Sequence, residues 1–223
     1  MIKIIGRKVI DLIAFRQGIL FVLKEQIPNG QYKVSFYSYD LQTQSIATVT
    51  KNAYLMTKFG SAYETIVPHL EDYISCAAQR LSDGKTFIVY SSGEIGIFAE
   101  NGELLFTDHA NYNHSSVREA AAVGNHVWCT VPNENAIVRY NTSKKRIDMR
   151  LGERNDATFE RPVFISAADK TLFVSCKNGH CVNSVSLDDF SVTKSHTFNE
   201  PVLEYFRVAD SEFAVLESGI YLL

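Results

Sequence analysis

The sequence predicts an all-β protein, and within that class a β-propeller of five four-stranded blades. Three observations carry this prediction. Segments with the character of β-hairpins recur along the 223 residues at roughly even spacing. Their strands alternate β-branched and aromatic residues with polar ones and end at Asn, Asp and Gly, the residues that tight turns favour. The chain also shows no sustained helical period of apolar residues.

Five segments open the repeats. Each has an apolar strand, a short polar turn and a second strand ending in an aromatic-rich run, and they cover residues 9–21, 73–87, 117–128, 163–173 and 202–213. Their starts are 64, 44, 46 and 39 residues apart. Internal periods of about 40–50 residues are typical of propeller blades.

A second hairpin follows each of the first four segments. These hairpins cover residues 33–50, 95–106, 136–149 and 182–193. The two hairpins of a unit supply four strands, and four strands in about 40–50 residues make one blade. The one long insertion, residues 54–69, is expected to be a loop or a short helix.

The fifth unit lacks a fourth strand, because only residues 219–223 follow its first hairpin. An unassigned strand at residues 2–5 precedes the first repeat, and pairing it with the last unit completes the fifth blade. Such closure removes an exposed sheet edge. We therefore expect one domain over residues 1–223, with blades starting near residues 9, 73, 117, 163 and 202. Two small β-sandwiches are the alternative arrangement of the same strands.

Composition and charge exclude several classes of partner. The chain has 22 Lys and Arg against 25 Asp and Glu, a net charge of −3, so it has no electrostatic footprint for nucleic acid or an anionic membrane. No stretch approaches the roughly 18 apolar residues of a membrane span. Charged residues interrupt the first apolar runs, unlike those of a signal peptide. We expect a cytoplasmic protein with no nucleic-acid or membrane partner.

Four cysteines are present, at positions 76, 129, 176 and 181. Most lie inside apolar runs, where Cys behaves as a small buried hydrophobe. Cys176 and Cys181 flank a turn of four residues, so they can face each other across two strands. Reduced structural thiols, a disulfide or redox pair, and a zinc site shared with His180 are the three possible roles of this pair. No second Cys/His pair is placed to complete a four-ligand zinc site.

The inner strands of a propeller converge on a central channel, so acidic residues on them are the main functional candidates. Aligning the five first strands puts Asp11, Glu119 and Glu204 in one column. Carboxylates at one depth around a narrow channel repel one another, which raises a pKa unless a cation lies among them. Such a group can hold a divalent cation or serve as the acid pair of a glycoside hydrolase.

Three arginines give the acidic column an alternative role in the same channel. Arg118, Arg161 and Arg207 lie close to the acidic column in the repeats. They can neutralise the carboxylates as structural salt bridges in a water-filled channel, or bind a ligand at its mouth. Structural ion pairs perturb carboxylates as well, so the acidic column alone does not define a reaction.

Two stretches of the repeats resemble a known family. Leu-Ser-Asp-Gly-Lys-Thr-Phe-Ile-Val-Tyr at 81–90 and Ala-Asp-Lys-Thr-Leu-Phe-Val-Ser at 168–175 resemble the repeat of the YVTN-type, lactonase-like β-propellers. Residues 159–174 are similar to an NHL repeat, whose pattern is Phe, Pro, an apolar strand and an Asp-rich turn. The resemblance implies a propeller and no particular reaction. Rings of these families commonly have six or seven blades, so this chain departs from them in ring size.

Catalytic motifs are missing from the sequence. None of the six histidines has a metal-binding spacing, and no nucleophile elbow, Walker loop or dinucleotide fingerprint occurs. We therefore expect a non-catalytic binding module without a cofactor, whose channel mouth binds a protein or a small ligand. Two enzymes remain as alternatives, a lactonase-like hydrolase that uses a divalent cation and a five-bladed glycosidase-like enzyme. Both would use Asp11, Glu119 and Glu204.

Overall fold

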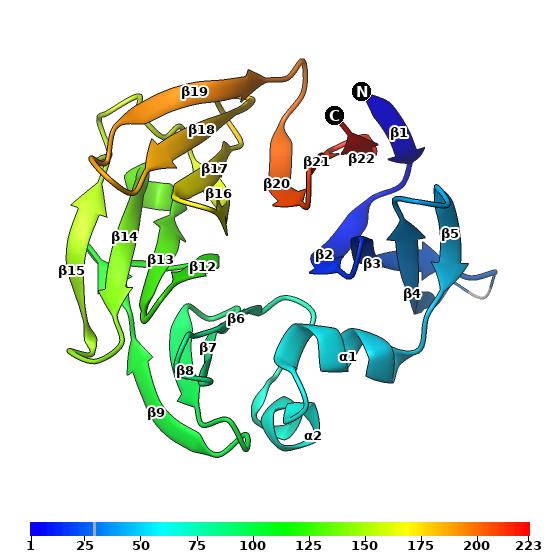
Figure 1. Ribbon diagram of the computed structural model, residues 1–223, viewed down its shortest axis with the longest axis horizontal. Coiled ribbons are helices and arrows are strands. Elements are labelled where there is room, and N and C mark those ends of the chain that lie inside the picture. The colour runs from blue at the N-terminus through cyan, green and yellow to red at the C-terminus, as the bar shows by residue number, and fades with distance from the viewer. Residues whose placement is uncertain (29) are drawn as a thin grey trace.

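The computed structural model describes residues 1–28 and 30–223, and its main elements are five four-stranded antiparallel sheets. The sheets stand around a central axis as the blades of a ring (Figure 1). The fold is a five-bladed β-propeller, which confirms the predicted class. We number the blades 1 to 5 in chain order from the sheet that begins with β2.

Each blade has the same order of strands from the axis outward. The inner strands are β2 (Val9–Phe15), β6 (Ala77–Arg80), β12 (Ala120–Val123), β16 (Pro162–Ala168) and β20 (Val202–Val208). The second strands are β3 (Gly18–Gln26), β7 (Thr86–Val89), β13 (His126–Val131), β17 (Thr171–Cys176) and β21 (Ser211–Leu216). These second strands are the most buried, because each lies between two neighbouring blades.

The third and fourth strands complete the blades. The third strands are β4 (Tyr32–Asp40), β8 (Glu94–Phe98), β14 (Ala136–Asn141), β18 (Cys181–Ser186) and β22 (Gly219–Leu222). The outer strands are β5 (Ser45–Thr48), β9 (Leu104–His109), β15 (Arg146–Leu151), β19 (Val192–Thr197) and β1 (Ile2–Ile5). Shorter elements lie in the connections: α1 (Lys51–Phe59), α2 (Tyr63–Ile66), η1 (Val67–His69), β10 (Asn111–Tyr112), β11 (Ser115–Ser116) and η2 (Pro132–Glu134).

The inner strands of blades 2 and 3 begin later than the sequence pattern suggests, at Ala77 and Ala120 instead of near residues 73 and 117. The residues before Ala77 turn around Asp72, whose carboxylate accepts the backbone N–H of Ile74 at 2.9 Å and the hydroxyl of Ser75 at 2.6 Å. This local turn replaces ladder pairing, because a short acidic side chain satisfies the backbone groups instead.

The N-terminal strand closes the ring, as predicted. Strand β1 pairs antiparallel with β22 and becomes the outer strand of blade 5. The two termini lie side by side there (Figure 1). Gly219 makes the close approach possible: its φ is +141°, and a Cβ atom there would lie 1.9 Å from the carbonyl oxygen of Ile5.

A helical segment separates blades 1 and 2. Helix α1 begins after Thr50, whose side chain accepts the backbone N–H of Ala53 at 3.2 Å. Tyr54, Leu55 and Phe59 of this helix are buried between Val22 of blade 1 and Ile88 of blade 2, in one continuous hydrophobic cluster. The insertion expected as a loop or a short helix is therefore a helical wedge that fills one blade interface (Figure 1). The other neighbouring blades pack sheet against sheet.

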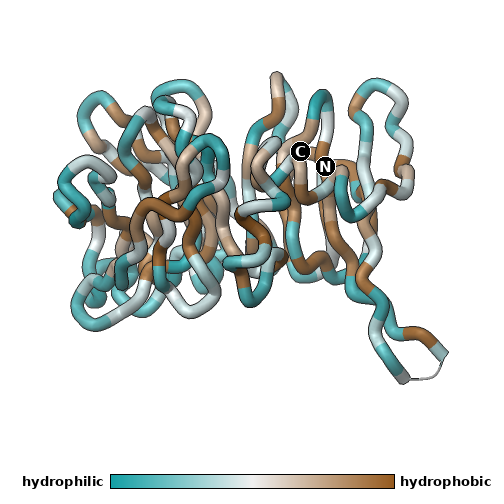
Figure 2. The backbone as a smooth tube through the Cα atoms, turned by 90° about the horizontal axis from the view of Figure 1, so that it is seen from below, coloured by the Kyte–Doolittle hydropathy of each residue, from teal (hydrophilic) through white to brown (hydrophobic). Residues whose placement is uncertain are grey.

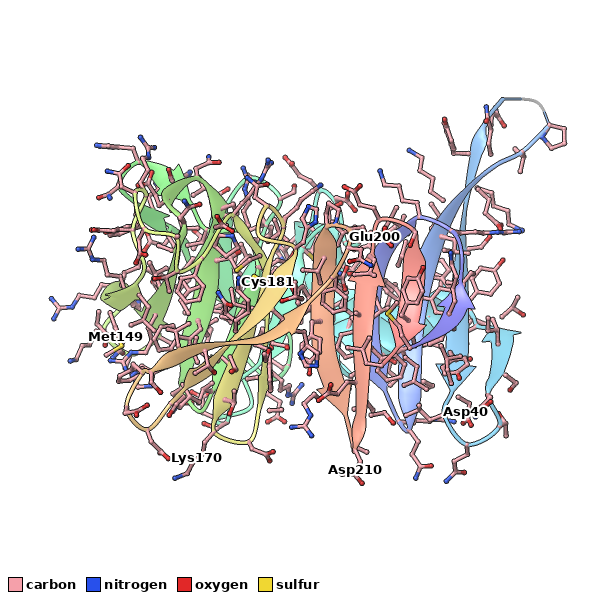
Figure 3. The ribbon with its side chains drawn as sticks, turned by 90° about the horizontal axis from the view of Figure 1, so that it is seen from above. Asp40, Met149, Lys170, Cys181, Glu200 and Asp210 are labelled. Atoms are coloured by element: carbon pink, nitrogen blue, oxygen red, sulfur yellow. The ribbon has the colours of Figure 1, made fainter. Side chains whose placement is uncertain are left out.

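The two ends of the channel carry different connections. We call the face where the inner strands begin the start face and the opposite one the end face. Asp40, Lys170 and Asp210 lie in turns along the end face, whereas Glu200 lies near the start face (Figure 3). The hairpin of β3 and β4 extends beyond the start face as an arm (Figure 2). Among the described residues, no helix is long and apolar enough to cross a membrane.

The closure of blade 5 generates the first prediction. Gly219→Ala should lower the free energy of unfolding by about 2 kcal/mol or more, because the new methyl group must push β1 away from β22. Gly124→Ala is the matched control, since Gly124 also has a positive φ, of +62°, but a Cβ atom there would have no neighbour within 4 Å. It should cost only the left-handed backbone penalty of about 1 kcal/mol. Equal losses in urea denaturation would contradict the role of β1 in closure.

Candidate functional site

A cavity of about 300 Å³ occupies the channel at the centre of the ring. Inner strands of all five blades line it, together with Thr57 and Lys58 of helix α1. Much of its wall consists of small side chains: Ala14, Ala77, Ala78, Ala120, Ala121, Ala122 and Ala167. Small residues leave the space open because larger ones would fill a channel surrounded by only five blades.

The cavity lies toward the end face rather than toward the mouth that the sequence favoured. Its lining includes the later residues of the inner strands, such as Ala14, Gln79 and Arg207. Helix α1 explains this placement, because it connects β5 to β6 on the start face and brings Lys58 to that side of the cavity. The carboxylate of Asp11 and the side chain of Glu119 also line the cavity.

A buried ion pair lies on the start-face side of this cavity. Lys58 Nζ lies 2.8 Å from Asp11 Oδ2, with 3% of the lysine side chain and 17% of the aspartate side chain exposed. The ammonium group also donates to the carbonyl oxygen of Ile74 at 2.7 Å and lies 3.2 Å from the Tyr54 hydroxyl. The Tyr54 hydroxyl in turn donates to Asp11 Oδ2. Three partners thus satisfy the buried lysine, as a desolvated ammonium requires.

The helix places Lys58 by simple periodicity. Tyr54 and Lys58 are four residues apart on α1, so both side chains lie on the same side of the helix. Burial is the largest single effect on the pKa of Lys58 and lowers it, but the charge and hydrogen bond of Asp11, together with Cys76 and Glu119, raise that pKa above its ordinary value. Lys58 is therefore charged. Burial, followed by the Asp11 charge and hydrogen bond, raises the pKa of Tyr54 far above its ordinary value, which keeps its proton on the hydroxyl.

The two glutamates of the predicted column lie in the same electrostatic environment. Burial raises the pKa of Glu119 to about 8, with the negative charge of Asp11 adding to the rise and the positive charge of Lys58 opposing it. Burial, then the charges of Asp11 and Glu119, raise the pKa of Glu204 well above its ordinary range. Its Oε2 atom is buried and has no hydrogen-bond partner among the described residues. Both glutamates are thus protonated at neutral pH.

The three acidic residues of the predicted column lie together, but only two of them line the cavity. The charge of Asp11 acts on the pKa of Glu119, and the charges of Asp11 and Glu119 act on the pKa of Glu204, as expected of neighbouring side chains. Asp11 and Glu119 line the cavity, whereas Glu204 lies beyond its lining.

The three arginines do not supply the neutralising charge. Arg118 donates to the carbonyl oxygen of Ser91. Arg161 is exposed, and Arg207 lies at the cavity wall with its Nε 3.7 Å from Glu212. Lys58 takes the role proposed for them. The sequence holds one signal for it, a lysine at helical spacing from the apolar residues Tyr54 and Leu55.

No group of three or more His, Cys, Asp or Glu side chains in residues 1–28 and 30–223 is close enough to hold a metal ion. In the channel, Lys58 lies at the position where a divalent cation would have to balance Asp11. All four cysteines are buried and free.

Comparisons with known proteins show the fold alone. No protein-family model matches the chain, and no curated protein is similar to it in sequence. A solved streptogramin B lyase superposes with a TM-score of 0.58 at 13% identity, covering 97% of this chain and 80% of the lyase. Sqt1 of Saccharomyces cerevisiae gives a TM-score of 0.54 at 13% identity, over 96% of this chain and 71% of Sqt1. The WD40 repeats of RRP9 give 0.52 at 10% identity, over 93% and 57% of the two chains. The lyase is named as an enzyme, and these similarities carry no function to this chain.

The Lys58–Asp11 pair generates the second prediction. Lys58→Met keeps much of the side-chain volume but leaves Asp11 buried without a counterion, so it should lower the free energy of unfolding by about 3–5 kcal/mol. Lys170→Met is the control, because Lys170 Nζ lies 3.0 Å from Asp188 in a pair that is largely exposed. The control should change little. Similar losses for both variants in urea denaturation would contradict the importance of the buried pair.

The raised pKa of Glu119 generates the third prediction. Between its ordinary value of about 4.3 in the unfolded chain and about 8 in the folded one, the folded state holds a proton that the unfolded state has lost. Stability therefore falls as pH rises through this range. Glu119→Gln should flatten that fall, by on the order of 1 kcal/mol per pH unit.

Urea denaturation at several pH values between about 5.5 and 8 measures this slope, because this window lies between the two pKa values. Glu103→Gln, at an exposed position of the same chain, is the matched control and should keep the slope of the unchanged protein. An unchanged slope in Glu119→Gln would show that Glu119 is ionised at neutral pH.

Proposed function

We propose that this protein is a non-catalytic binding module that needs no cofactor and takes a small organic cation, such as an amine, into its central channel. The observation that carries the proposal is the cavity of about 300 Å³ whose lining includes Asp11 and Glu119. Its volume is at the lower end of the range for small-molecule sites, so it suits a compact ligand. A protein bound at the channel mouth is the other form of the predicted module, and the small volume of the cavity favours the small ligand.

The charges around the cavity support a cationic ligand. The Asp11 carboxylate is already paired with Lys58 and Tyr54, so it adds little net charge. Burial raises the pKa of Glu119 to about 8, so this residue holds a proton at neutral pH. An ammonium group placed beside it would stabilise the charged form and release that proton. Binding should therefore become tighter as pH rises toward about 8.

A hydrolase remains the second candidate, and one observation favours it. Glu119 is protonated, whereas the Asp11 carboxylate forms an ion pair with Lys58, and a protonated acid close to a carboxylate can serve as an acid and a base. Against it, Asp11 would have to act as the base while its Oδ2 atom accepts bonds from Tyr54 and Lys58. The lactonase-like form would also need a divalent cation close to Lys58. The binding role needs neither condition.

Ligand binding in the channel is the fourth prediction. Ethylammonium, a four-carbon diamine and guanidinium serve as probes, with matched neutral alcohols and carboxylates as controls. The cations should raise the melting temperature and, in calorimetry at neutral pH, release a proton on binding. Ala167→Leu at the exposed end of the channel wall should abolish the effect by filling the entrance. Ala47→Leu on outer strand β5 is the matched control and should leave it unchanged.

Three results would contradict the proposal. The first is binding of the cations no tighter than that of the neutral analogues, and the second is equal binding by Ala167→Leu and Ala47→Leu. The third is chemical conversion of an ester, lactone or glycoside probe by the unchanged protein, with loss of the activity in Glu119→Gln, which would favour the hydrolase.

A further inference from the structure

A pair of cysteines in blade 4 lies apart from the channel. Cys176 ends β17 and Cys181 begins β18, and the two residues are directly opposite in the antiparallel ladder. Cβ atoms of opposite residues are about 4.5–5.5 Å apart, which is close to the separation that a disulfide spans. The structure therefore places the two sulfurs where one bond can join them without moving a strand far.

The two thiols differ in their access to small molecules. Cys181 lines a second cavity, of about 260 Å³, together with Glu160, Asn183 and Lys194. Cys176 lies behind it, fully buried, and does not belong to the cavity lining. A small reagent entering this cavity would meet Cys181 first.

The polar groups around the pair hold it in a defined arrangement. Asn183 Nδ2 donates to Cys176 Sγ at 3.7 Å, and Cys181 Sγ donates to Asn183 Oδ1 at 3.8 Å. Gly179 packs closely over the second thiol: a Cβ atom at this position would lie 3.1 Å from Cys181 Sγ and 2.6 Å from Glu160 Oε2. Because Gly179 has no side chain, the turn packs against Cys181 without covering its thiol.

Electrostatics also distinguishes Cys181 from the other cysteines. A hydrogen bond from Cys176 lowers the pKa of Cys181 below its ordinary value, with Lys194 lowering it further while burial and Glu160 oppose the change. Burial raises the pKa of Cys76 to about 11 and that of Cys129 above its ordinary value. Since the thiolate is the nucleophile, the cavity beside Cys181 and its lowered pKa both favour Cys181 as the thiol that reacts first.

We propose that Cys181 and Cys176 form an oxidation site for small hydroperoxides, in which Cys181 reacts first and Cys176 resolves the product to a cross-strand disulfide. The Cys181 thiolate attacks the terminal peroxide oxygen, so an S–O bond forms, the O–O bond breaks and the alkoxide leaves and takes a proton from water. Cys176 sulfur then attacks Cys181 sulfur, an S–S bond forms, and hydroxide leaves with the Cys176 proton as water. Two thiols are oxidised while one hydroperoxide is reduced to an alcohol and water.

The disulfide would join the two ends of the turn at residues 177–180. This turn lies on the start face, and Lys177 Nζ in it lies 3.2 Å from Glu217 of blade 5. Oxidation would therefore restrain a turn of blade 4 that contacts blade 5, and it would leave the channel residues unchanged.

The test is oxidation of the folded protein with one equivalent of hydrogen peroxide, followed by unfolding, alkylation and mass spectrometry. The unchanged protein should lose two of its four thiols, and its mass should fall by two hydrogen atoms with a disulfide mapped to Cys176 and Cys181. Cys176→Ser should stop at a sulfenic acid on Cys181, which dimedone traps. Cys181→Ser should keep its three remaining thiols. Cys129→Ser is the matched control for a buried thiol and should still form the disulfide.

Lys194→Gln keeps the proposal testable if the cysteine variants fold poorly, because Lys194 is exposed on β19. This variant should slow the oxidation several-fold, whereas Lys170→Gln, also exposed in blade 4, should not. Four thiols remaining after peroxide, oxidation of Cys76 or Cys129 at the same rate, or reaction only after unfolding would each overturn the proposal.

Discussion

The chemistry of this propeller depends on a single buried ion pair, Lys58 with Asp11. Five inner strands bring three acidic side chains to the axis, and each of them loses solvation there. One ammonium group, 3% exposed, can hold one carboxylate in its charged form. The other two acids keep their protons instead, because a second and third charge would lack a partner. The channel therefore combines one internal ion pair with two neutral acids, and the proposed preference for a cationic ligand rests on this arrangement.

The wedge that carries Lys58 also explains the shape of the ring. Four of the five blade interfaces pack sheet on sheet, and α1 fills the fifth with Tyr54, Leu55 and Phe59. The same segment thus completes the hydrophobic core and the electrostatics of the channel. In blade 5, which packs against the other face of blade 1, β1 completes the sheet and removes its open edge. Helix α1 and strand β1 together let a short ring close around a cavity, and the small residues on the inner strands keep that cavity open.

Much of the fold could be predicted because each hairpin has a recognisable local sequence pattern. Turn residues and alternating strands located the blades, and the missing strand of the last unit pointed to residues 2–5. The column of Asp11, Glu119 and Glu204 followed from alignment of the inner strands, since equivalent positions of a ring share one depth.

Lys58 could not be found in this way, because it lies in the insertion, where no repeat fixes its position. Arg118 and Arg207 contact Ser91 and Glu212 instead of the acidic column, since sequence proximity to an acid does not determine which cation packs against it. The ligand-binding role predicted for the arginines stays a prediction. The opposition of Cys176 and Cys181 was visible in the sequence, but the difference in access between them depends on the cavity beside β19.

The protonation of the channel acids underlies both the stability and the proposed ligand preference, and a carboxyl ¹³C NMR titration measures it without an intermediate step. The spectra follow each Asp and Glu side chain from acidic to alkaline pH, with Glu119→Gln and Glu204→Gln to assign the two signals. With one ion pair, Lys58 and Asp11, beside two neutral acids, we expect Glu119 to titrate near pH 8 and Glu204 to titrate well above the ordinary range of a glutamate. Titration of both glutamates at about pH 4 would contradict this arrangement, because the channel would then hold three negative charges around one lysine.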